Sequence, residues 1–420
     1  MKRTLSLFLA LCPLFPAFAD NWPMWRGANG DGTCSESKLP EKWGMEENVA
    51  WKVALPDRGN STPVVWGDKV FVTQAIEGGE KRLLLCFDKK TGKQLWDAGT
   101  IYIPKAVELT HATNPHCSAS PATDGERVIV FHASAGVFCY DMNGKELWKR
   151  TDLGKLHHIW GCGTSPVLAG DRVFLNFGPG ENTVLYAFDK KTGKTLWEHK
   201  EPGGASGEAG NKTWTGSWSD PLLRKTGSRY ELLMSYAGRA CAFDPLSGKE
   251  LWTCGGLTPL VYNSPLYTDG LAIFMSGYGG SAMAVKTGGS GDVTEKNRVW
   301  HEPRVAQRIG SGVIHDGNHY ILTDGGIVEC RDVKTGKLLY NERLKGPGPT
   351  AKNWSSLVLS ADGKCYAANQ GGDCFVFKAG PVFELISTNS LGELIIGSIA
   401  VSDGQLFIRG YKNLWCIGKQ

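Results

Sequence analysis

The sequence has no internal hydrophobic run long enough to cross a membrane, and it carries almost no net charge. Beyond residue 19, no stretch approaches the roughly 18 unbroken apolar residues that a membrane helix needs. Lys and Arg number 46 against 42 Asp and Glu, and 44 against 42 once Lys2 and Arg3 are set aside. We therefore expect no integral membrane segment, and this balance gives no reason to expect nucleic acid or an anionic membrane as a partner.

Cysteine is present, but not in the pattern of a disulfide framework. Of the 12 Cys residues, an odd number remains once Cys12 in the N-terminal segment is set aside. Several of the others stand two residues before the Asp of a repeated phrase, at a position that other copies fill with Ala. These residues are Cys86, Cys139 and Cys330, beside Ala187 and Ala242. A position that takes Cys or Ala alike is a small buried niche, so most thiols belong to the core, and one or two disulfides remain open.

The N-terminus has the features of a secretory signal peptide. Lys2 and Arg3 precede an apolar stretch over residues 5–14, and Ala17-Phe18-Ala19 fits the small-x-small rule for cleavage. We expect residues 1–19 to be removed before Asp20, which leaves residues 20–420 as one domain in the periplasm or another exported location. The alternatives are a retained N-terminal membrane segment and a lipid anchor at Cys12.

One phrase recurs along the chain. The copies read "LLCFDKKTGKQLWDA", "VFCYDMNGKELWKR", "LYAFDKKTGKTLWEH", "ACAFDPLSGKELWTC" and "VECRDVKTGKLLYNE". The closing aromatic residue returns every 40 to 55 residues, at Trp96, Trp148, Trp197, Trp252, Trp300 and Tyr340. A period of this length with strand-like composition is typical of β-repeat architectures.

A second signal runs in step with the first. Eight segments join a short apolar strand to an alternating strand through a turn rich in Gly, Asp or Asn, as in "STPVVWGDKVFV" from Ser61 and "GSIAVSDGQLFIRG" from Gly397. This pattern predicts a β-hairpin. With the two strands of the repeated phrase, each unit holds four strands.

The repeats predict an all-β protein, an eight-bladed β-propeller of four-stranded antiparallel blades. The last unit ends near Gln420 without a fourth strand, while residues 48–56 read as an unpaired outer strand. Pairing these two ends closes the ring and removes two open sheet edges. The alternative is seven blades, if the degenerate unit at residues 286–300 is an insertion.

The repeated phrase is interpreted as scaffold, because a catalytic centre needs one unrepeated set of residues. Its Asp can accept backbone N–H groups in a turn, and its Gly supplies the positive φ. The Trp can bury a large ring against the next blade. The repeat residues are Trp96, Trp148, Trp197 and Trp252, with Gly92, Gly144, Gly193, Gly248 and Gly336.

These phrases resemble the repeat of the pyrroloquinoline quinone (PQQ)-like propeller superfamily, over almost all of residues 49–418. The resemblance implies the propeller fold, which quinoprotein alcohol dehydrogenases share with the propeller of the outer-membrane β-barrel assembly machinery. The segments "NWPMWRGANGDG" from Asn21 and "FELISTNSLGE" from Phe383 are similar to exported propellers of planctomycete-type bacteria. For that subgroup the resemblance implies fold and export, and little about chemistry.

The resemblance to the dehydrogenases implies features that this sequence does not have. Those enzymes carry adjacent cysteines that stack on the quinone, whereas Cys162 stands alone in "GCG", and no Cys-x-x-Cys-His haem motif occurs. Calcium would need a cluster of oxygen ligands, and the nearest acidic residues, Glu108 and Glu208, do not form one. We expect no cofactor and no catalytic residue, with PQQ and calcium as the alternative.

Function in a propeller usually lies at the mouth of the central channel. The segments that precede the inner strands should line it, and they differ from blade to blade: "THATNPHCSAS", "LHHIWGCGTS", "NKTWTGSWS", "VYNS", "AQRIGSG" and "KNWSS". His and Cys gather in the first two, but their spacing does not support a metal site, and a polar channel lining is the simpler interpretation. The candidate ligand-binding residues are His116, His158, Trp160, Trp214, Trp218, Asn263, Arg308 and Trp354.

Aromatic faces with scattered hydrogen-bonding groups suit a sugar ring, a flat cofactor or an extended peptide. The alternative is that these Trp residues fill the channel or pack between blades. We expect a monomeric, non-catalytic scaffold that binds a protein, glycan or small ligand at the channel mouth. A divergent PQQ-dependent alcohol or sugar dehydrogenase and a carbohydrate-binding module are the alternative functions.

Overall fold

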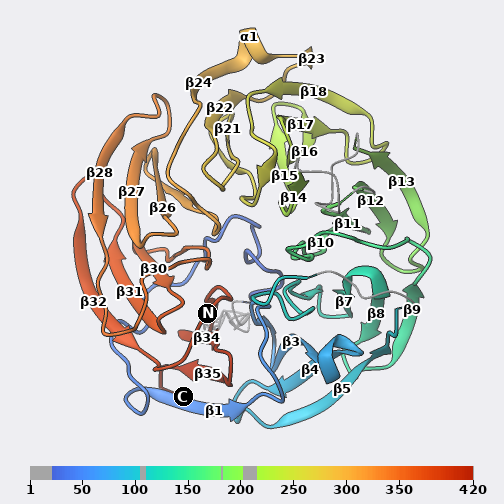
Figure 1. Ribbon diagram of the computed structural model, residues 1–420, viewed down its shortest axis with the longest axis vertical. Helices are drawn as coiled ribbons and strands as arrows, with labels where there is room; N and C mark the ends of the chain where they lie inside the picture. The colour runs from blue at the N-terminus through green and yellow to red at the C-terminus, as the bar shows by residue number, and fades with distance from the viewer. Residues whose placement is uncertain (1–20, 105–109, 181–182, 202–214, 420) are drawn as a thin grey trace, which may run out of the picture.

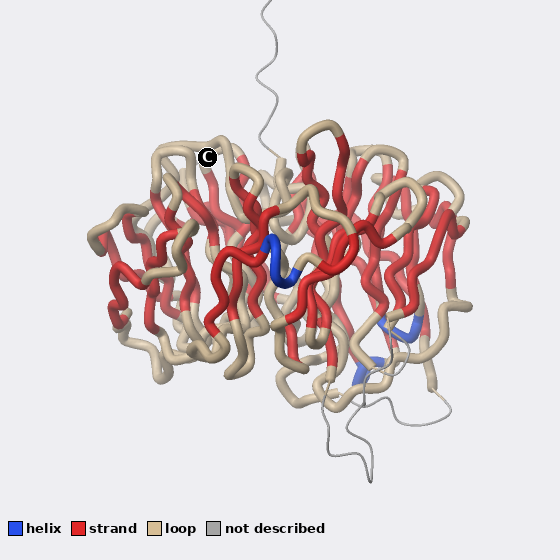
Figure 2. Tube along the Cα trace, turned by 90° about the horizontal axis from the view of Figure 1, so that it is seen from above, coloured by secondary structure: helices blue, strands red, loops and turns tan. Residues whose placement is uncertain are grey.

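The computed structural model describes residues 21–104, 110–180, 183–201 and 215–419. In this part of the chain, eight antiparallel sheets form a ring around a central axis (Figure 1). The expected fold, an eight-bladed propeller, is confirmed. Figure 2 shows the ring from the side, with the strands running between its two faces.

The first four blades follow one another along the chain, and in each the strands run in order from the inside of the ring to the rim. Blade 1 contains β2 (Val64–Trp66), β3 (Lys69–Ile76), β4 (Lys81–Asp88) and β5 (Gln94–Ile101). Blade 2 contains β6 (Ala122–Thr123), β7 (Arg127–Phe131), β8 (Val137–Asp141) and β9 (Glu146–Arg150). Blade 3 contains β10 (Val167–Ala169), β11 (Arg172–Phe177), β12 (Val184–Asp189) and β13 (Thr195–Lys200). Blade 4 contains β15 (Leu222–Thr226), β16 (Arg229–Tyr236), β17 (Arg239–Phe243) and β18 (Glu250–Gly255).

The other four blades complete the ring. Blade 5 contains β20 (Leu266–Thr268), β21 (Leu271–Met275), β22 (Ala282–Lys286) and β24 (Arg298–Glu302). Blade 6 contains β25 (Val313–His315), β26 (Asn318–Leu322), β27 (Ile327–Asp332) and β28 (Leu338–Arg343). Blade 7 contains β29 (Val358–Leu359), β30 (Lys364–Ala368), β31 (Asp373–Lys378) and β32 (Glu384–Ser390). Blade 8 contains β33 (Ala400–Ser402), β34 (Gln405–Arg409), β35 (Asn413–Ile417) and, from the other end of the chain, β1 (Val49–Ala54).

Blade 8 closes the ring as the sequence predicts. Strand β1 pairs antiparallel with β35, with Val53 opposite Leu414 and Ala54 opposite Asn413. The region that raised the seven-blade alternative holds both a blade strand and an insertion. Between β22 and β24 the chain adds β23 (Gly291–Asp292), which pairs with β18 of blade 4, and the short helix α1 (Thr294–Asn297). The smaller elements are the β14 (Gly216–Ser217) and β19 (Leu260–Val261) pair, η1 (Glu77–Gly79) and η2 (Ala133–Ala135).

A Trp–Gly contact joins five of the eight blades to the next one in the described part of the chain. The indole N–H of Trp148 donates to the carbonyl of Lys190 at 2.9 Å, and its ring covers Gly193 in the following blade. The same arrangement places Trp51 on Gly92, Trp96 on Gly144, Trp197 on Gly248 and Trp300 on Gly336. At each of these glycines φ is near +70° to +86°, and a Cβ would stand within 3 Å of the ring. Only glycine allows both the turn and the close approach of the ring.

Trp252 departs from this pattern because blade 5 lacks the usual turn. Its indole N–H donates to Glu231 at 3.0 Å, and the insertion after β22 covers it. Nine of the eleven described cysteines are buried, which agrees with a core role for these thiols.

A second set of contacts ties the blades together around the channel. Immediately before each inner strand, a backbone N–H donates to the side-chain oxygen of the corresponding residue in the next blade, at 2.8 to 3.1 Å. The eight bonds form a closed circle, which we call the belt. Its members are Thr62, Ser120, Ser165, Asp220, Ser264, Ser311, Ser356 and Ser398.

The segment before β1 crosses one end of the channel. We call residues 21–47 the strap. Trp22 pairs with Val65 of blade 1, Thr123 of blade 2 donates to the carbonyl of Pro23, and Leu359 of blade 7 donates to that of Gly32. These contacts lie near the ends of inner strands that start at the opposite face. The strap therefore spans the channel at the face away from the mouth segments.

The Trp–Gly contact between blades can be tested with Gly193→Ala. We expect the free energy of unfolding to fall by about 2–4 kcal/mol, because the new Cβ would combine left-handed strain with a clash against Trp148. The measurement is denaturant unfolding. Gly170→Ala is the matched control: Gly170 has a similar φ of 60° but nothing within 4 Å of the added Cβ, so we expect a loss of only about 1–2 kcal/mol there. An equal loss of unfolding free energy in the two variants would show that the Trp148–Gly193 contact does not contribute to stability.

Candidate ligand-binding site at the channel mouth

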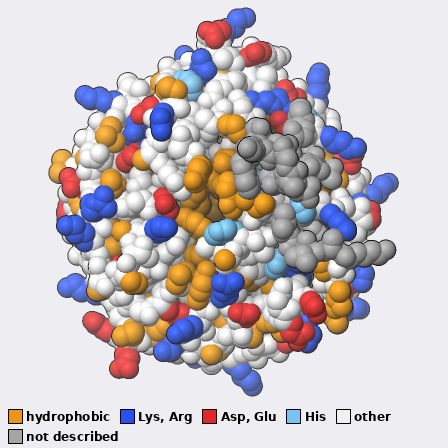
Figure 3. Space-filling view, viewed as in Figure 1, with side chains coloured by type: hydrophobic (Ala, Val, Ile, Leu, Met, Phe, Trp, Pro, Cys, Tyr) orange, Lys and Arg blue, Asp and Glu red, His pale blue; other side chains and the backbone are white. Residues whose placement is uncertain are grey.

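The channel contains a cavity of about 290 Å³ that opens on the face carrying the mouth segments. Figure 3 views the molecule as in Figure 1 and shows a hollow in the middle of this face, with hydrophobic side chains gathered around it. Side chains from blades on all sides contribute to the lining. They include Asn60, Asn114, Trp160, Trp218, Tyr262, Tyr278, Gln307, Ile309, Trp354 and Ile396.

One wall of the cavity is a continuous aromatic surface. The rings of Trp218 and Tyr262 stack with centroids 4.7 Å apart and an interplanar angle of 23°. Trp160 lies 6.1 Å from Trp218 and 6.3 Å from Tyr278. Tyr278 stands at the rim with half of its surface exposed, in a turn between Gly277 and Gly279 that both have positive φ. The wall therefore offers ring faces to a ligand that enters from solvent.

The floor of the cavity comes from the strap. Trp25 lines the cavity from below, and the guanidinium of Arg26 lies 5.8 Å from its ring. Arg26 is buried and donates to the backbone carbonyls of Leu357 and Asp31 at 2.8 and 2.7 Å, and to that of Gly312. Burial lowers its pKa to about 10. This anchoring from blades 6 and 7 holds Trp25 across the channel and gives the cavity a closed end.

Several polar side chains of the cavity are already hydrogen-bonded within the protein. The amide nitrogen of Asn60 donates to the Thr113 carbonyl at 2.7 Å and to Ser118 at 3.0 Å. That of Asn114 donates to the carbonyls of Trp160 and Cys162 at 3.0 and 2.8 Å. These bonds fix the mouth segments of blades 1, 2 and 3 to one another, so the rim on this side is preorganised.

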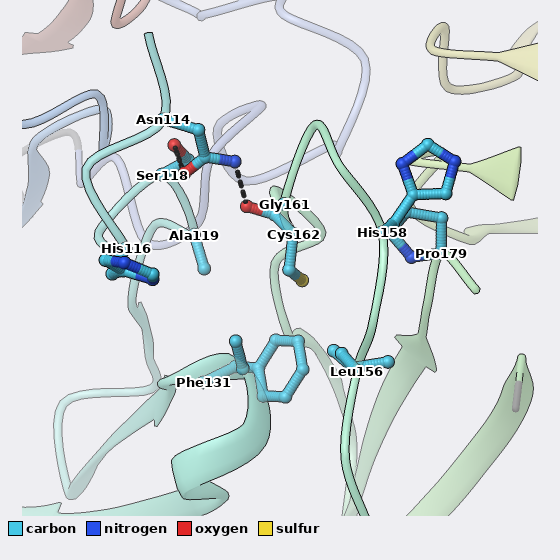
Figure 4. Close-up of a pocket in the computed structure, with 11 residues that line it drawn as sticks. Asn114, His116, Ser118, Ala119, Phe131, Leu156, His158, Gly161, Cys162 and Pro179 are labelled. Carbon is cyan, nitrogen blue, oxygen red and sulfur yellow. Dashed lines mark hydrogen bonds between the residues drawn. The ribbon is translucent and has the colours of Figure 1, made fainter. Parts of the chain in front are cut away.

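The two candidate histidines line a smaller neighbouring cavity of about 20 Å³, which Figure 4 shows with Asn114, Cys162 and Leu156. His158 packs edge-on against Trp218, with ring centroids 4.8 Å apart. Burial lowers the pKa of His158 to about 4, so its ring is neutral at physiological pH. His116 has φ +61° and packs against Gly79. Both histidines support the mouth segments from outside the main cavity.

The structure brings some of the sequence candidates to the main cavity and not others. Trp160, Trp218 and Trp354 line it. Asn263 is fully buried and donates to the carbonyl of Gly310 at 2.6 Å. Arg308 is also fully buried and paired with Glu329, and burial lowers its pKa. Trp214 lies outside the described residues.

Other lining residues were not singled out from the sequence. Tyr262 and Gln307 belong to two of the mouth segments whose sequences differ from blade to blade. Their place in the lining could therefore have been predicted from the sequence. Trp25 sits in the strap, far from any repeat, and its place under the channel depends on long-range contacts. Tyr278 lies in a turn between the second and third strands of blade 5, and nothing in the local sequence distinguishes that turn.

Asp220 is the one carboxyl group in the belt. Its Oδ1 accepts the backbone N–H of Ser165 at 2.8 Å, and its own N–H donates to Ser264 at 2.9 Å. Burial raises the pKa of Asp220 well above its usual range, and the hydrogen bonds from Ser165 oppose this only in part. A hydroxyl fills the same position in the other blades, so the carboxyl is an exception that the belt tolerates.

Within the described part of the chain, no cluster of three or more His, Cys, Asp and Glu side chains is placed to hold a metal ion. The described residues also contain no helix with the length and apolar character needed to span a membrane.

Comparison with known proteins agrees with the repeat and the ring. The family model described as "Outer membrane protein assembly factor BamB" matches residues 80–342, which is more than half of the chain. The chain belongs to this family. A curated relative with the same description, from Burkholderia pseudomallei, is 25% identical over 158 residues, which cover 37% of this chain and 34% of that protein. The matched region is thus about a third of that relative.

Solved structures share the architecture at low sequence identity. BamB from Moraxella catarrhalis superposes with a TM-score of 0.60 at 14% identity, over 89% of this chain and 97% of that one. A europium-containing methanol dehydrogenase gives 0.67 at 14%, over 94% and 90%. A quinohemoprotein alcohol dehydrogenase from Comamonas testosteroni gives 0.66 at 12%, over 96% and 81%. At these identities the likeness shows the fold alone, and it confirms the resemblance seen in the sequence.

Because of the carboxyl group of Asp220 in the belt, we expect the free energy of unfolding to depend on pH, and Asp220→Asn should remove this dependence. Because the folded-state pKa of Asp220 is raised, stability is highest below the unfolded value of about 3.9 and falls as pH rises toward the folded value. We expect the variant to gain stability over the wild type as pH goes from 4 to 7, while it keeps an oxygen for the Ser165 N–H. Denaturant unfolding across pH measures this. Asp171→Asn, on an exposed turn, is the control, and a stability difference independent of pH would refute the prediction.

Proposed function

We propose that this chain is an exported, non-catalytic scaffold that binds a polypeptide partner at the channel mouth. The observation that carries the proposal is the lining of the main cavity. Its described residues are rich in aromatic rings and include one exposed histidine, His111, but no Lys, Arg, Asp or Glu. Such a surface can hold an uncharged part of a ligand, and its one described imidazole, His111, has Thr113 Oγ1 at 2.7 Å from Nδ1 and no carboxylate beside it in the lining.

The lining also does not fit PQQ with calcium, the cofactor pair implied by the likeness to dehydrogenases. PQQ carries carboxylates that need cationic or N–H partners, and calcium prefers several oxygen ligands with carboxylates among them. The described lining residues include no Lys, Arg, Asp or Glu, and the amide N–H groups of Asn60 and Asn114 already donate hydrogen bonds within the protein. We therefore derive no reaction step through this cofactor.

Two further observations support the proposal. The family carries the description of an assembly factor for outer-membrane proteins, a role in which a scaffold binds other polypeptides. The N-terminal segment has the sequence features of a secretory signal, which agrees with action outside the cytoplasm. A glycan remains the second candidate ligand, on the single observation that Trp160, Trp218 and Trp354 share one cavity.

Site-specific photocrosslinking can test where the partner binds. A photoreactive phenylalanine analogue replaces Tyr278 at the mouth, or Tyr230 at the β15–β16 turn of the opposite face, in cells that express the full chain. The two tyrosines are similarly exposed, at 51% and 54%. We expect a discrete polypeptide adduct at position 278 and none at 230. Adding Trp354→Ala should weaken the adduct, because that ring lines the same cavity.

Other outcomes would count against the proposal. Equal adducts at the two positions would mean that the mouth has no special role. A lack of any polypeptide adduct at 278, with oxidation of alcohols or sugars by the purified protein in the presence of PQQ and calcium, would instead support the dehydrogenase alternative.

A further inference from the structure

The polar groups around the main cavity are largely satisfied by the protein itself. Both amide hydrogens of Asn60 and of Asn114 are donated to backbone or Ser118 acceptors. The indole N–H of Trp218 donates to the Gly161 carbonyl at 2.9 Å, and that of Trp354 donates to Asp324 at 2.9 Å. The N–H donors of these rings and amides are therefore engaged with the protein, whereas Asn60 Oδ1 is buried without a partner among the described residues.

The belt hydroxyls that reach the cavity are occupied in the same way. The side-chain oxygens of Thr62, Ser165 and Ser398 each accept a backbone N–H from a neighbouring blade. Among the described lining residues, Gln307, Tyr262, Tyr278 and Trp25 make no side-chain hydrogen bond within the protein, and the exposed His111 is bonded at Nδ1 to Thr113 at 2.7 Å. The cavity thus combines a large aromatic surface with very few polar groups that a ligand could engage.

This inventory discriminates between ligand classes. A sugar ring brings several hydroxyls into the site, and most would lose water without gaining a partner, which disfavours binding. A cation would find ring faces but no carboxylate, and Trp218 and Tyr262 cover each other's facing surfaces by stacking. An uncharged aromatic group brings ring faces and at most a few polar atoms, which matches what the lining offers.

The volume of the cavity and its closed end further restrict which ligands can bind. A cavity of about 150 Å³ is enough to hold benzene, so 290 Å³ has room for a two-ring indole. Because the strap places Trp25 under the cavity, a chain cannot be threaded through the channel from the mouth. The cavity can receive a side chain at the tip of a loop or at a chain end.

We propose that the cavity binds an uncharged aromatic side chain, Trp, Tyr or Phe, presented by the partner polypeptide. The ring inserts between the aromatic wall and Trp354, above Trp25, and any polar atom it carries meets Gln307 or a tyrosine hydroxyl. This inference rests on the proposed function, since it specifies how the partner is recognised at the mouth.

Isothermal titration of the purified protein with small probes tests the ligand class. N-acetyl-L-tryptophanamide represents the neutral aromatic side chain, N-acetyl-L-tryptophan adds one carboxylate, cellobiose represents a sugar, and tetramethylammonium represents a cation. We expect saturable binding of the amide, at least about tenfold weaker binding of the carboxylate because the described lining residues include no Lys or Arg to pair with it, and no binding of the other two. Preferential binding of cellobiose or tetramethylammonium would overturn the proposal.

Matched variants locate the binding. Tyr278→Ala removes a ring from the rim, and we expect it to weaken the binding of N-acetyl-L-tryptophanamide about 3- to 10-fold, the range of one aromatic contact. Tyr230→Ala removes a ring of similar exposure from the opposite face and should leave the affinity unchanged. Both side chains are half exposed, so neither variant should affect folding strongly. Equal effects of the two variants would contradict binding in the cavity.

The result is separable from the outcome of crosslinking. If a polypeptide adduct forms at position 278 but the aromatic amide does not bind, the mouth is a docking site of different chemistry and this inference is wrong while the proposed function holds. If neither the adduct nor amide binding is found, both fail. If the amide binds and N-acetyl-L-tryptophanamide also suppresses the adduct, both are supported.

Discussion

The belt of eight hydrogen bonds sets the dimensions on which the channel depends. Each bond runs from a backbone N–H to a side-chain oxygen in the next blade, so one short side chain and one hydrogen bond separate neighbouring blades around the whole circle. A short hydroxyl side chain is the natural residue for this task, because a longer one would widen the ring. The channel radius, and with it the cavity, follows from eight small side chains.

Near the rim, neighbouring blades are held together by the Trp–Gly contact, which requires particular residue types at fixed positions. There each Trp covers the glycine of the next turn and donates to the residue after the turn's Asp, as Trp148 does with Gly193 and Lys190. This contact occurs at five of the eight described blade interfaces and needs the same two residue types each time, so the repeat is visible in the sequence. Between the belt and the Trp contacts, the mouth segments are free to differ, and their differences make the cavity.

This division explains how much the sequence could predict. Blade number, strand order and closure by β1 follow from the periodic phrases, because every copy repeats the same local demands. Trp160, Trp218 and Trp354 could be predicted to line the cavity, because they are aromatic residues that come shortly before inner strands. Asn263 and Arg308 occupy equivalent places, yet their side chains turn into the protein toward Gly310 and Glu329. Sequence position gives the segment, while the direction of a side chain depends on its partners in other blades.

The strap shows a further limit and connects stability with function. Its place across the channel depends on contacts from blades 1, 2, 6 and 7 with a segment that has no repeat of its own. Arg26 donates to three backbone carbonyls at once and so carries its charge into the interior, with the partly buried carboxylate of Asp31 as the nearby opposite charge. The same anchoring holds Trp25 under the cavity. A contact that closes one face of the ring therefore also shapes the surface that a ligand entering from the other face would meet.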